Sequence, residues 1–474
     1  SDYRELLMNN SVGILRDPNL EEMKRELDEM GLNSETFCMA PYIAIDLDQD
    51  GAVYTCYRGK QNLGGWKKVS LKDSFNSPHM QKIRRDLYDG RRNKNCRSCY
   101  AAEDRNSNSP RVHFYYDFLD RYYYNNPEGA RAFIDKIKKN HIDADIKDLK
   151  RGELRPSSLC NLRCMHCGPH SSTKWVETLN KGDNAKVYMD NEGLMENGDG
   201  VINHGIIDAG LTTYYKNTLT SDTDYEEDLL EVLDSLEHLS FTGGEPLLTP
   251  EHPRYLQHFI DSGSAKEMFL EYNTNLNVKN IEKFFPLWEQ FRHIHIRASI
   301  DASFDTYEYF RTYGKINLLK ECLGKIQKFR MEKMGGNNGK WYRGMKINGT
   351  VTYNIFSALR WKELTKDWTS HDLEFHVSLI IDHPTSVKYL PNVLRDKALE
   401  DMHWCYDNIF EFTDNEKYAN IYKHHTKQCI NYTEGFDNPD DKFPKHVARY
   451  IDFCDKASGN SYKDYFPDLI KHLE

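Results

Sequence analysis

From about residue 150 onward, the chain alternates strand-like and helix-like patterns, and this alternation constrains the fold more than any other feature. Six stretches have the composition of buried strands: 153–156, 238–242, 267–273, 293–300, 346–353 and 373–381. Most are separated by amphipathic helical patterns: 251–261, 279–291, 316–332 and 357–367. Strands that alternate with helices form parallel sheets, and right-handed crossovers curl such sheets toward a barrel. The pattern predicts an α/β fold with a partial (β/α)6 TIM-like barrel over residues 151–395.

The segments before and after this barrel are predicted to form smaller units. Residues 1–34 are expected to be a helical appendage, and 35–110 a small α+β domain rich in cysteine. Within that domain, a strand at 42–47 and a return strand at 53–56 flank the turn signal Asp50-Gly51. Residues 111–150 are expected to be a helical bridge, and 396–474 a helical C-terminal region.

An insertion at 181–228 interrupts the barrel between its first and second strands. It carries eleven Asp or Glu residues, three Lys and no Arg. An insertion here projects toward the face where barrel enzymes do their chemistry, and a lid or substrate-binding element is one interpretation. A disordered surface loop is the other. As a lid, its acidity would favour a cationic or neutral substrate over a polyphosphate.

Composition excludes several classes of protein. The chain has 474 residues, 39% of them hydrophobic, and a net charge of -10, which disfavours duplex nucleic acid as a partner. No apolar run approaches the roughly 18 residues of a membrane span, and the polar first residues do not resemble a targeting signal. Eleven cysteines, many in close clusters, are typical of metal ligands in a reducing compartment. We therefore expect a cytoplasmic protein without a membrane segment.

Three cysteines follow the first barrel strand with the spacing C-x3-C-x2-C: Cys160, Cys164 and Cys167. Three thiolates can bind three irons of a 4Fe–4S cluster and leave the fourth iron without a protein ligand. A metal site with an open position is typical of catalysis, whereas structural sites are closed. A zinc knuckle that lacks one ligand, or three buried thiols, are the alternatives.

Four more cysteines form a second group in the N-terminal region: Cys38, Cys56, Cys96 and Cys99. Four thiolates make a closed site. Zinc and a second 4Fe–4S cluster both fit such a ligand set, and the thiolates alone do not select the metal. Cys405, Cys429 and Cys454 are spaced too widely for a local metal site, and we expect free or core thiols there.

The triad closely resembles the iron–sulfur motif of the radical S-adenosylmethionine (SAM) superfamily. In that family, the open iron binds the amino and carboxylate groups of SAM. The sequence Gly243-Gly244-Glu245-Pro246 follows the second predicted strand and is similar to the family's GGEP motif. The resemblance implies that Glu245 contacts the methionine amino group. Glycines also let a backbone approach a ligand closely.

Later strands end in further positions that match the family. Asn275 lies in a segment similar to the family's Thr-Asn-Gly near the ribose, although Leu276 stands where glycine is common. Ser299 and Arg311 occupy the places of the serine and arginine that hold the SAM carboxylate, which a guanidinium suits geometrically. Two further residues are placed near the adenine by the resemblance: His166 and Val351.

The N-terminal cysteine group resembles the auxiliary-cluster domains of radical SAM enzymes, called twitch or, when larger, SPASM. Such domains usually follow the catalytic barrel, and here the module precedes it. With four cysteines, the resemblance implies the twitch type with one auxiliary 4Fe–4S cluster, and zinc remains the alternative.

The resemblance implies an activity. An enzyme of this kind reductively cleaves SAM to a 5'-deoxyadenosyl radical, which abstracts hydrogen from an unactivated C–H bond. The expected substrate is a peptide or protein side chain or a small metabolite, with a nucleotide or nucleobase as an alternative. An electron donor such as flavodoxin or ferredoxin is expected. The alternative of another class is a non-catalytic binding protein stabilised by zinc.

Overall fold

The computed structural model describes residues 18–48, 52–56, 70–104, 106, 108–123, 126–192, 223–334, 344–380 and 383–473. Most of the predicted insertion, residues 193–222, lies outside these ranges, as do the Asp50-Gly51 turn and residues 1–17 of the predicted appendage. Among the described residues, none of the helices combines the length and the apolar character needed to cross a membrane.

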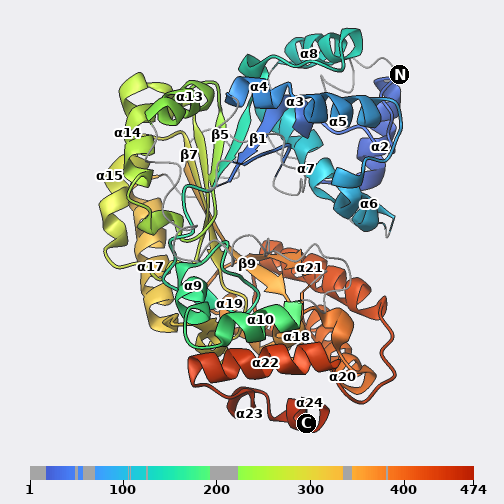
Figure 1. Cartoon of the computed structure of the whole chain (residues 1–474), viewed down its shortest axis with the longest axis vertical. Coiled ribbons are helices and arrows are strands. Elements are labelled where there is room, and N and C mark those ends of the chain that lie inside the picture. The colour runs from blue at the N-terminus through green and yellow to red at the C-terminus, as the bar shows by residue number, and fades with distance from the viewer. Residues whose placement is uncertain are drawn as a thin grey trace.

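An eight-stranded sheet forms the centre of the molecule, in the order β10-β9-β7-β6-β5-β3-β1-β2 (Figure 1). Its six barrel strands are β3 (Arg151–Leu154), β5 (His238–Phe241), β6 (Phe269–Thr274), β7 (His293–Ser299), β9 (Gly344–Tyr353) and β10 (Phe375–Leu379). These strands are parallel and adjacent in sequence order. The predicted α/β fold with six β-α units is confirmed, and all six predicted strands are present.

Helices cover one face of this sheet. They are α13 (Thr223–Leu233), α14 (His252–Ser262), α15 (Phe285–Trp288), α17 (Ile316–Lys333), α18 (Ile355–Ala358) and α19 (Trp361–Thr369). Figure 1 shows α13, α14, α15 and α17 on the side of the sheet away from the N-terminal module. Strand residues on this face are apolar and buried, and Tyr272 of β6 packs on Trp288 of α15 with ring centroids 5.6 Å apart.

The opposite face of the sheet is polar. Alternate strand positions place these side chains on it: Arg151, Glu153, His238, Ser240, Glu271, Asn273, His293, His295, Arg297, Ser299, Lys346, Asn348 and Thr350. A closed TIM barrel fills its interior mainly with branched apolar side chains. The inner face of this partial barrel is instead filled by polar side chains, and Glu271 lies 3.3 Å from His295 and 3.0 Å from Arg297 on it.

The N-terminal module extends the barrel sheet. Strand β1 (Ala44–Leu47) pairs antiparallel with β2 (Val53–Tyr54) and parallel with β3, where Asp46 is opposite Glu153. The predicted strand at 42–47 is wrong at its start, because Tyr42 and Ile43 belong to the helical turn α3 (Ala40–Ile43). Pro41 is in the first turn of that helix, where its fixed φ favours helical geometry.

Helices make up the rest of the module and the bridge. These are α2 (Leu20–Glu29), α4 (Leu71–Phe75), α5 (Pro78–Tyr88), α6 (Arg97–Glu103), α7 (Pro110–Tyr116), a π-helix at Asp117–Tyr122, and α8 (Pro127–Lys139). The bridge covers one end of the polar sheet face, because Asp117 accepts a hydrogen bond from Arg151 at 2.9 Å and Arg121 lies over the Phe269 ring. The predicted helical bridge therefore also closes that end of the barrel.

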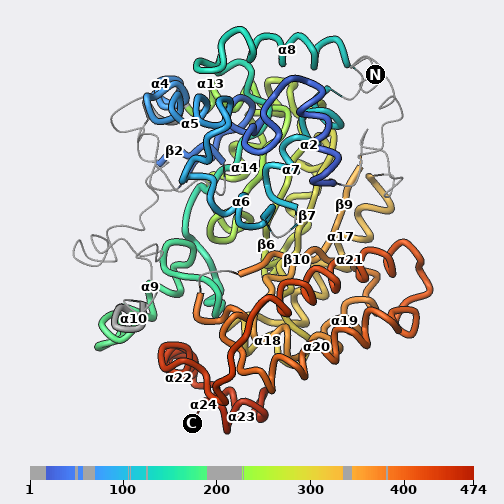
Figure 2. The backbone as a smooth tube through the Cα atoms, turned by 90° about the vertical axis from the view of Figure 1, so that its right-hand side faces the viewer, coloured from blue at the N-terminus to red at the C-terminus, as the bar shows by residue number. Residues whose placement is uncertain are grey.

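The C-terminal region is helical, as predicted. Its helices are α20 (Asn392–Asp407), α21 (Glu416–Glu434), α22 (Lys445–Ser458), α23 (Tyr462–Tyr465) and α24 (Ile470–Leu473). Helix α22 lies beside α9 (Thr173–Leu179) and α10 (Asn184–Glu192), which follow the cysteine triad (Figures 1 and 2). Three rings join these helices: Trp175 stacks on Phe453 of α22, and Tyr188 packs against both.

Leu154 lies at the junction of the module and the barrel, where β3 pairs with both β1 and β5. It is fully buried, so Leu154→Ala should lower the free energy of unfolding by about 2–5 kcal/mol in urea denaturation. Met331→Ala is the control, because Met331 is 66% exposed on α17, and its change should stay within about 0.5 kcal/mol. Equal effects of the two substitutions would contradict the assigned core.

Candidate functional site

The cysteine triad lies in a loop that a small antiparallel ribbon ties to a distant segment. Strand β4 (Arg163–Cys164) pairs with β8 (Arg311–Thr312), with Cys164 opposite Arg311. This ribbon brings the predicted SAM-carboxylate ligand Arg311 to the triad across 147 residues of sequence. Strands of two residues carry no recognisable periodicity, so the sequence did not predict this pairing.

The three thiols lie together in a buried site. Cys160 and Cys164 are buried and Cys167 is partly buried, and the three pack with Leu162 as a separate small cluster. Burial raises the pKa of all three thiols, that of Cys167 to about 12. Cys164 adds to the rise at Cys160 and Cys167 by charge repulsion, which requires the sulfurs to be close. A bound metal would reverse these shifts, because its charge stabilises thiolates.

The triad loop is held by hydrogen bonds from two regions of the chain. Helix α9 contributes the indole N–H of Trp175, which donates to the Cys164 carbonyl at 3.0 Å. Helix α22 contributes the Tyr450 hydroxyl, which donates to the Met165 carbonyl at 2.6 Å. Arg163 is buried and donates to the Cys454 carbonyl at 3.1 Å. The C-terminal region is therefore part of the support of the triad, a role that the sequence did not predict.

The two glycines of the predicted GGEP motif are required by contact with the triad loop. Gly243 has φ of +101°, which disfavours any other residue. A Cβ on Gly244 would lie 2.3 Å from the Leu159 carbonyl oxygen, and one on Gly243 would lie 2.9 Å from the Ser157 carbonyl oxygen. The backbone N–H groups of Gly244 and Glu245 donate to Ser157 and Leu159. The two glycines therefore let their backbone pack closely against the residues that precede Cys160.

Glu245 is buried in a ring of hydrogen-bond donors. Its carboxylate accepts from the Thr274 hydroxyl at 2.7 Å, the Asn275 backbone N–H at 2.7 Å and the Leu247 backbone N–H at 3.2 Å. Burial raises its pKa to about 7, although these donors oppose the rise. These hydrogen bonds fix the position of the carboxylate, and none of the three donors carries a positive charge. Such a carboxylate is suited to bind an ammonium ion.

Asn275 lies next to the first cysteine of the triad. Its amide nitrogen donates to Asn161 Oδ1 at 3.0 Å and lies 3.8 Å from Cys160 Sγ. Leu276, which replaces the glycine common in the family, has φ of +50°. The backbone at this position therefore keeps the left-handed geometry that glycine adopts easily. The leucine side chain makes that geometry strained.

Arg311 is buried between the triad and an acidic residue. Its Nη1 donates to Cys164 Sγ at 3.3 Å, and its Nη2 forms an ion pair with Asp301. The His166 ring stacks on Phe310 at 5.2 Å, and its Nε2 lies 3.7 Å from Asp301 Oδ2. Burial lowers the pKa of His166 to about 4, so the ring is neutral near pH 7. Roles in SAM binding were predicted from the sequence for His166 and Arg311, and none was predicted for Asp301.

The other two predicted contacts lie on opposite faces of the sheet. Ser299 is the last residue of β7 and lies on the polar face, paired with Thr350 of β9. Val351 is fully buried on the helix-covered face, so its side chain is directed away from the polar face. Only the backbone of Val351 can take part in binding there, as expected for adenine contacts made through main-chain atoms.

Buried polar atoms without partners support a missing ligand at the triad. Within the described part of the chain, His166 Nδ1 and Arg311 Nε have no hydrogen-bond partner. Such atoms are rare in folded proteins because each costs about 1–3 kcal/mol. The three thiols fit the ligands of a 4Fe–4S cluster. The unpartnered nitrogens of His166 and Arg311 beside them fit hydrogen bonds to SAM bound at the open iron.

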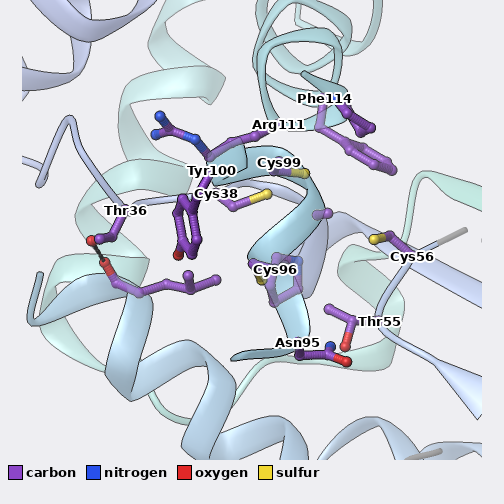
Figure 3. A pocket seen from close by; sticks show the side chains of 14 residues that line it. Thr36, Cys38, Thr55, Cys56, Asn95, Cys96, Cys99, Tyr100, Arg111 and Phe114 are labelled. Carbon is purple, nitrogen blue, oxygen red and sulfur yellow. Dashed lines mark hydrogen bonds between the residues drawn. The ribbon is translucent and has the colours of Figure 1, made fainter. Parts of the chain in front are cut away.

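The second group of cysteines lines one cavity in the N-terminal module (Figure 3). Cys38 precedes α3, Cys56 follows β2, Cys96 ends a short 3-10 helix, and Cys99 lies on α6. Figure 3 shows Cys56 facing the other three cysteines across the cavity. Across the residues that the structure describes, no three His, Cys, Asp or Glu side chains already have ligand geometry around one point.

The cavity has the chemistry of a thiolate-ligated metal site. Burial raises the pKa of Cys38, and repulsion from Cys96, Cys56 and Cys99 raises it further. The Arg111 backbone N–H hydrogen-bonds to Cys99 and opposes the rise at that thiol. Thr55 Oγ1 is buried in the cavity wall and has no partner among the described residues. The four cysteines would repel one another as thiolates. A metal cation bound between them would remove this repulsion.

Comparison with known families identifies this module. The model of the SPASM family, an iron–sulfur cluster-binding domain, matches residues 38–100 and so includes all four cysteines. Residues 38–100 match the SPASM iron–sulfur domain. The match confirms the auxiliary iron–sulfur domain of the twitch or SPASM kind predicted from the sequence, although the model that matches is SPASM and not the twitch type expected from four cysteines. It favours an iron–sulfur cluster over zinc in the cavity. The SPASM domain precedes the barrel and shares its sheet through β1.

Comparisons of the whole chain give weaker similarities. No curated protein sequence matches. A solved structure of native anSMEcpe with bound AdoMet and a Cp18Cys peptide is 14% identical, with a TM-score of 0.34, and the match covers 55% of this chain and 61% of that one. Streptococcus suis SuiB bound to its precursor peptide SuiA is 14% identical, with a TM-score of 0.33 and coverages of 61% and 52%. The chain therefore spans less than two thirds of the structures it matches.

Gly244→Ala should displace the triad loop, because the new Cβ would meet the Leu159 backbone at 2.3 Å. We expect a lower melting temperature and a smaller iron content after anaerobic reconstitution. The matched control is Gly324→Ala on α17, where nothing lies within 4 Å and alanine should stabilise the helix by about 1 kcal/mol. An unchanged melting temperature and iron content for Gly244→Ala would contradict the close packing.

Glu245 should make the stability of the metal-free protein depend on pH. Its pKa rises from 4.5 to about 7 on folding, so the folded protein holds a proton that the unfolded chain loses between these values. Stability should therefore fall as pH rises from 4.5 to 7, by up to about 3 kcal/mol from this group. Glu245→Gln should remove that component, as measured by denaturation at pH 5 and pH 7.5 for both proteins. Identical pH dependence of the two proteins would contradict the assignment.

Proposed function

We propose that the protein is a radical SAM enzyme that abstracts hydrogen from a C–H bond of its substrate. The observation that carries the proposal is the convergence of the buried triad with two of the predicted SAM-binding groups. Arg311 donates to Cys164, and Asn275, which binds the Glu245 carboxylate through its backbone, lies beside Cys160. Parallel strands place their carboxyl ends at one edge, which is where TIM-like barrels carry their active sites.

Each of these residues has a defined role in the proposal. Cys160, Cys164 and Cys167 hold a 4Fe–4S cluster, and SAM completes the coordination of its fourth iron. Glu245 binds the methionine ammonium group, for which its fixed carboxylate is suited. Arg311 binds the methionine carboxylate through the part of its guanidinium that no protein atom uses. Further contacts with SAM are proposed for Asn275, Ser299, His166 and the backbone of Val351.

The proposed chemistry begins with the cleavage of SAM. A reduced cluster at the triad would supply one electron, which splits the sulfonium C–S bond into methionine and a 5'-deoxyadenosyl radical. That radical would take a hydrogen atom from the substrate and become 5'-deoxyadenosine, which would leave the unpaired electron on the substrate carbon. The surrounding residues hold SAM and substrate in line and exclude water and competing hydrogen donors. The electron donor is proposed to be a flavodoxin or ferredoxin.

The substrate is proposed to bind against the polar face of the sheet. This face carries hydrogen-bonding side chains and charges of both signs, including Arg297, whose side chain is 40% exposed. A peptide or protein side chain, or a small polar metabolite, fits such a surface, and a nucleotide or nucleobase is the alternative. The SPASM domain contributes Asp46 and Asp48 to the adjoining edge, where both lie within 4 Å of Arg155. Substrate would then lie between the two proposed clusters.

Anaerobic reconstitution with iron and sulfide tests the proposal directly. The wild-type protein should bind about eight irons and form 5'-deoxyadenosine from SAM under reduction. Cys164→Ala should bind about four irons and form none. The control is Cys322→Ala on α17, whose buried thiol donates to the Val278 carbonyl far from both groups in sequence and should be dispensable for iron binding. Reconstituted wild-type protein that keeps zinc and forms no 5'-deoxyadenosine would instead support the zinc-stabilised binding protein.

The SPASM cysteines can be tested separately. Cys96→Ala removes one of four ligands from the closed site, so about four irons should be lost while the triad cluster and SAM binding are retained. Iron analysis and electron paramagnetic resonance (EPR) spectra of the reduced protein with and without SAM measure the two effects. If Cys96→Ala lost the SAM-dependent change in the EPR spectrum, the two cysteine groups would not be independent sites.

A further inference from the structure

Asp301 is a buried acidic residue at the point where three parts of the proposed SAM site meet. It follows β7, and its side chain is 1% exposed. One carboxylate oxygen, Oδ1, accepts from the Thr352 backbone N–H of β9 at 2.7 Å. The other, Oδ2, pairs with Arg311 of the β4–β8 ribbon and lies 3.7 Å from His166 of the triad loop.

The backbone of Asp301 is also held in an unusual conformation. Its φ is +48°, a left-handed value that costs energy for most residues and that Asp and Asn tolerate best. The following residue, Ala302, donates from its backbone N–H to the Ile300 carbonyl at 2.6 Å. This tight turn sets the carboxylate between β9 and the triad loop. Strained residues of this kind cluster at functional sites.

Charge explains why the carboxylate is needed at this place. Arg311 is buried, and a buried guanidinium without a counter-ion is strongly destabilised. Burial acts to raise the pKa of Asp301, but the attraction of Arg311 and the other groups around the carboxylate, including the Thr352 backbone N–H, together outweigh it and hold the pKa below its usual value. Asp301 therefore stays ionised and fixes one edge of the guanidinium. The Nε atom has no hydrogen-bond partner among the described residues, so its N–H can donate to a ligand.

We propose that Asp301 is the positioning residue that orients Arg311 for the carboxylate of SAM. It holds Nη2, so that Nη1 is directed at Cys164 and Nε remains available. Asp301 does not touch SAM in this proposal and acts through Arg311 alone. The inference rests on the proposed radical SAM function and adds Asp301, for which no sequence motif indicated a role.

The substitution Asp301→Asn tests the proposal with the least disturbance. Asparagine tolerates the left-handed backbone and preserves the side-chain size, but it carries no charge and can accept from only one of the two donors. We expect the dissociation constant of SAM to rise at least tenfold, while the iron content stays at the wild-type level. The measurement is a titration of the reduced, reconstituted protein with SAM to millimolar concentration, followed by the EPR change of the triad cluster.

Asp305→Asn is the matched control. Asp305 lies four residues away on an exposed turn and accepts from the Ser303 hydroxyl at 2.6 Å, without contact to Arg311. Its substitution makes the same chemical change and should leave the dissociation constant of SAM within twofold of wild type. A loss of affinity in this variant as large as that of Asp301→Asn would overturn the specific role of Asp301.

A double-mutant cycle separates positioning from a purely structural role. If Asp301 acts through Arg311, then Asp301→Asn should change SAM affinity less than twofold in an Arg311→Gln background. A structural role through Thr352 would instead cost the same factor in both backgrounds, and that result would overturn the proposal. Wild-type affinity in Asp301→Asn alone would overturn it as well.

The failure of the underlying function gives a different result. Reconstituted wild-type protein that shows no EPR change with SAM and no 5'-deoxyadenosine would overturn the proposed function and this inference together. Wild-type protein that binds and cleaves SAM, with an Asp301→Asn variant indistinguishable from it, would overturn the role of Asp301 only.

Discussion

The parallel pairing of six strands in sequence order is the constraint on which the rest of this protein depends. Because neighbouring strands run in the same direction, all of their carboxyl ends meet at one edge of the sheet. The triad loop follows β3, the glycine loop follows β5, Asn275 follows β6 and Asp301 follows β7. Residues more than 140 positions apart in the sequence therefore lie in one site, because each directly follows its own strand.

Within that edge, the site is held together by contacts between its own loops. The glycine loop lies directly against the residues that precede Cys160, and the ribbon of β4 and β8 joins the triad to Arg311. Two buried carboxylates are placed differently in this frame. Glu245 is surrounded by neutral donors and has a raised pKa, whereas Asp301 is paired with Arg311 and stays ionised. The two environments thus differ in charge: neutral groups hydrogen-bond to Glu245, and a cation of the protein itself pairs with Asp301.

The SPASM domain is attached through the sheet itself. Strand β1 adds to the edge of the barrel beside β3, so the polar face continues from the barrel onto Asp46 of the module. An edge strand exposes unpaired backbone groups, and pairing with β1 covers those of β3. At the other end of the chain, α22 binds the triad loop through Tyr450 and the Cys454 carbonyl. Regions that flank the barrel in sequence therefore contribute to the frame of one site.

The sequence by itself determined the six barrel strands, the parallel α/β fold and the two cysteine groups, because these depend on local periodicity and on fixed spacing. The motif positions Glu245, Asn275 and Arg311 were also predicted from the sequence, through their order at strand ends. Only the tertiary structure decided that β1 joins the barrel and that β4 pairs with β8. It also decided that Asp301 binds Arg311 and that α22 supports the triad. Contacts such as that between Arg163 and Cys454 join residues 291 positions apart, and local patterns carry no record of which distant side chains meet.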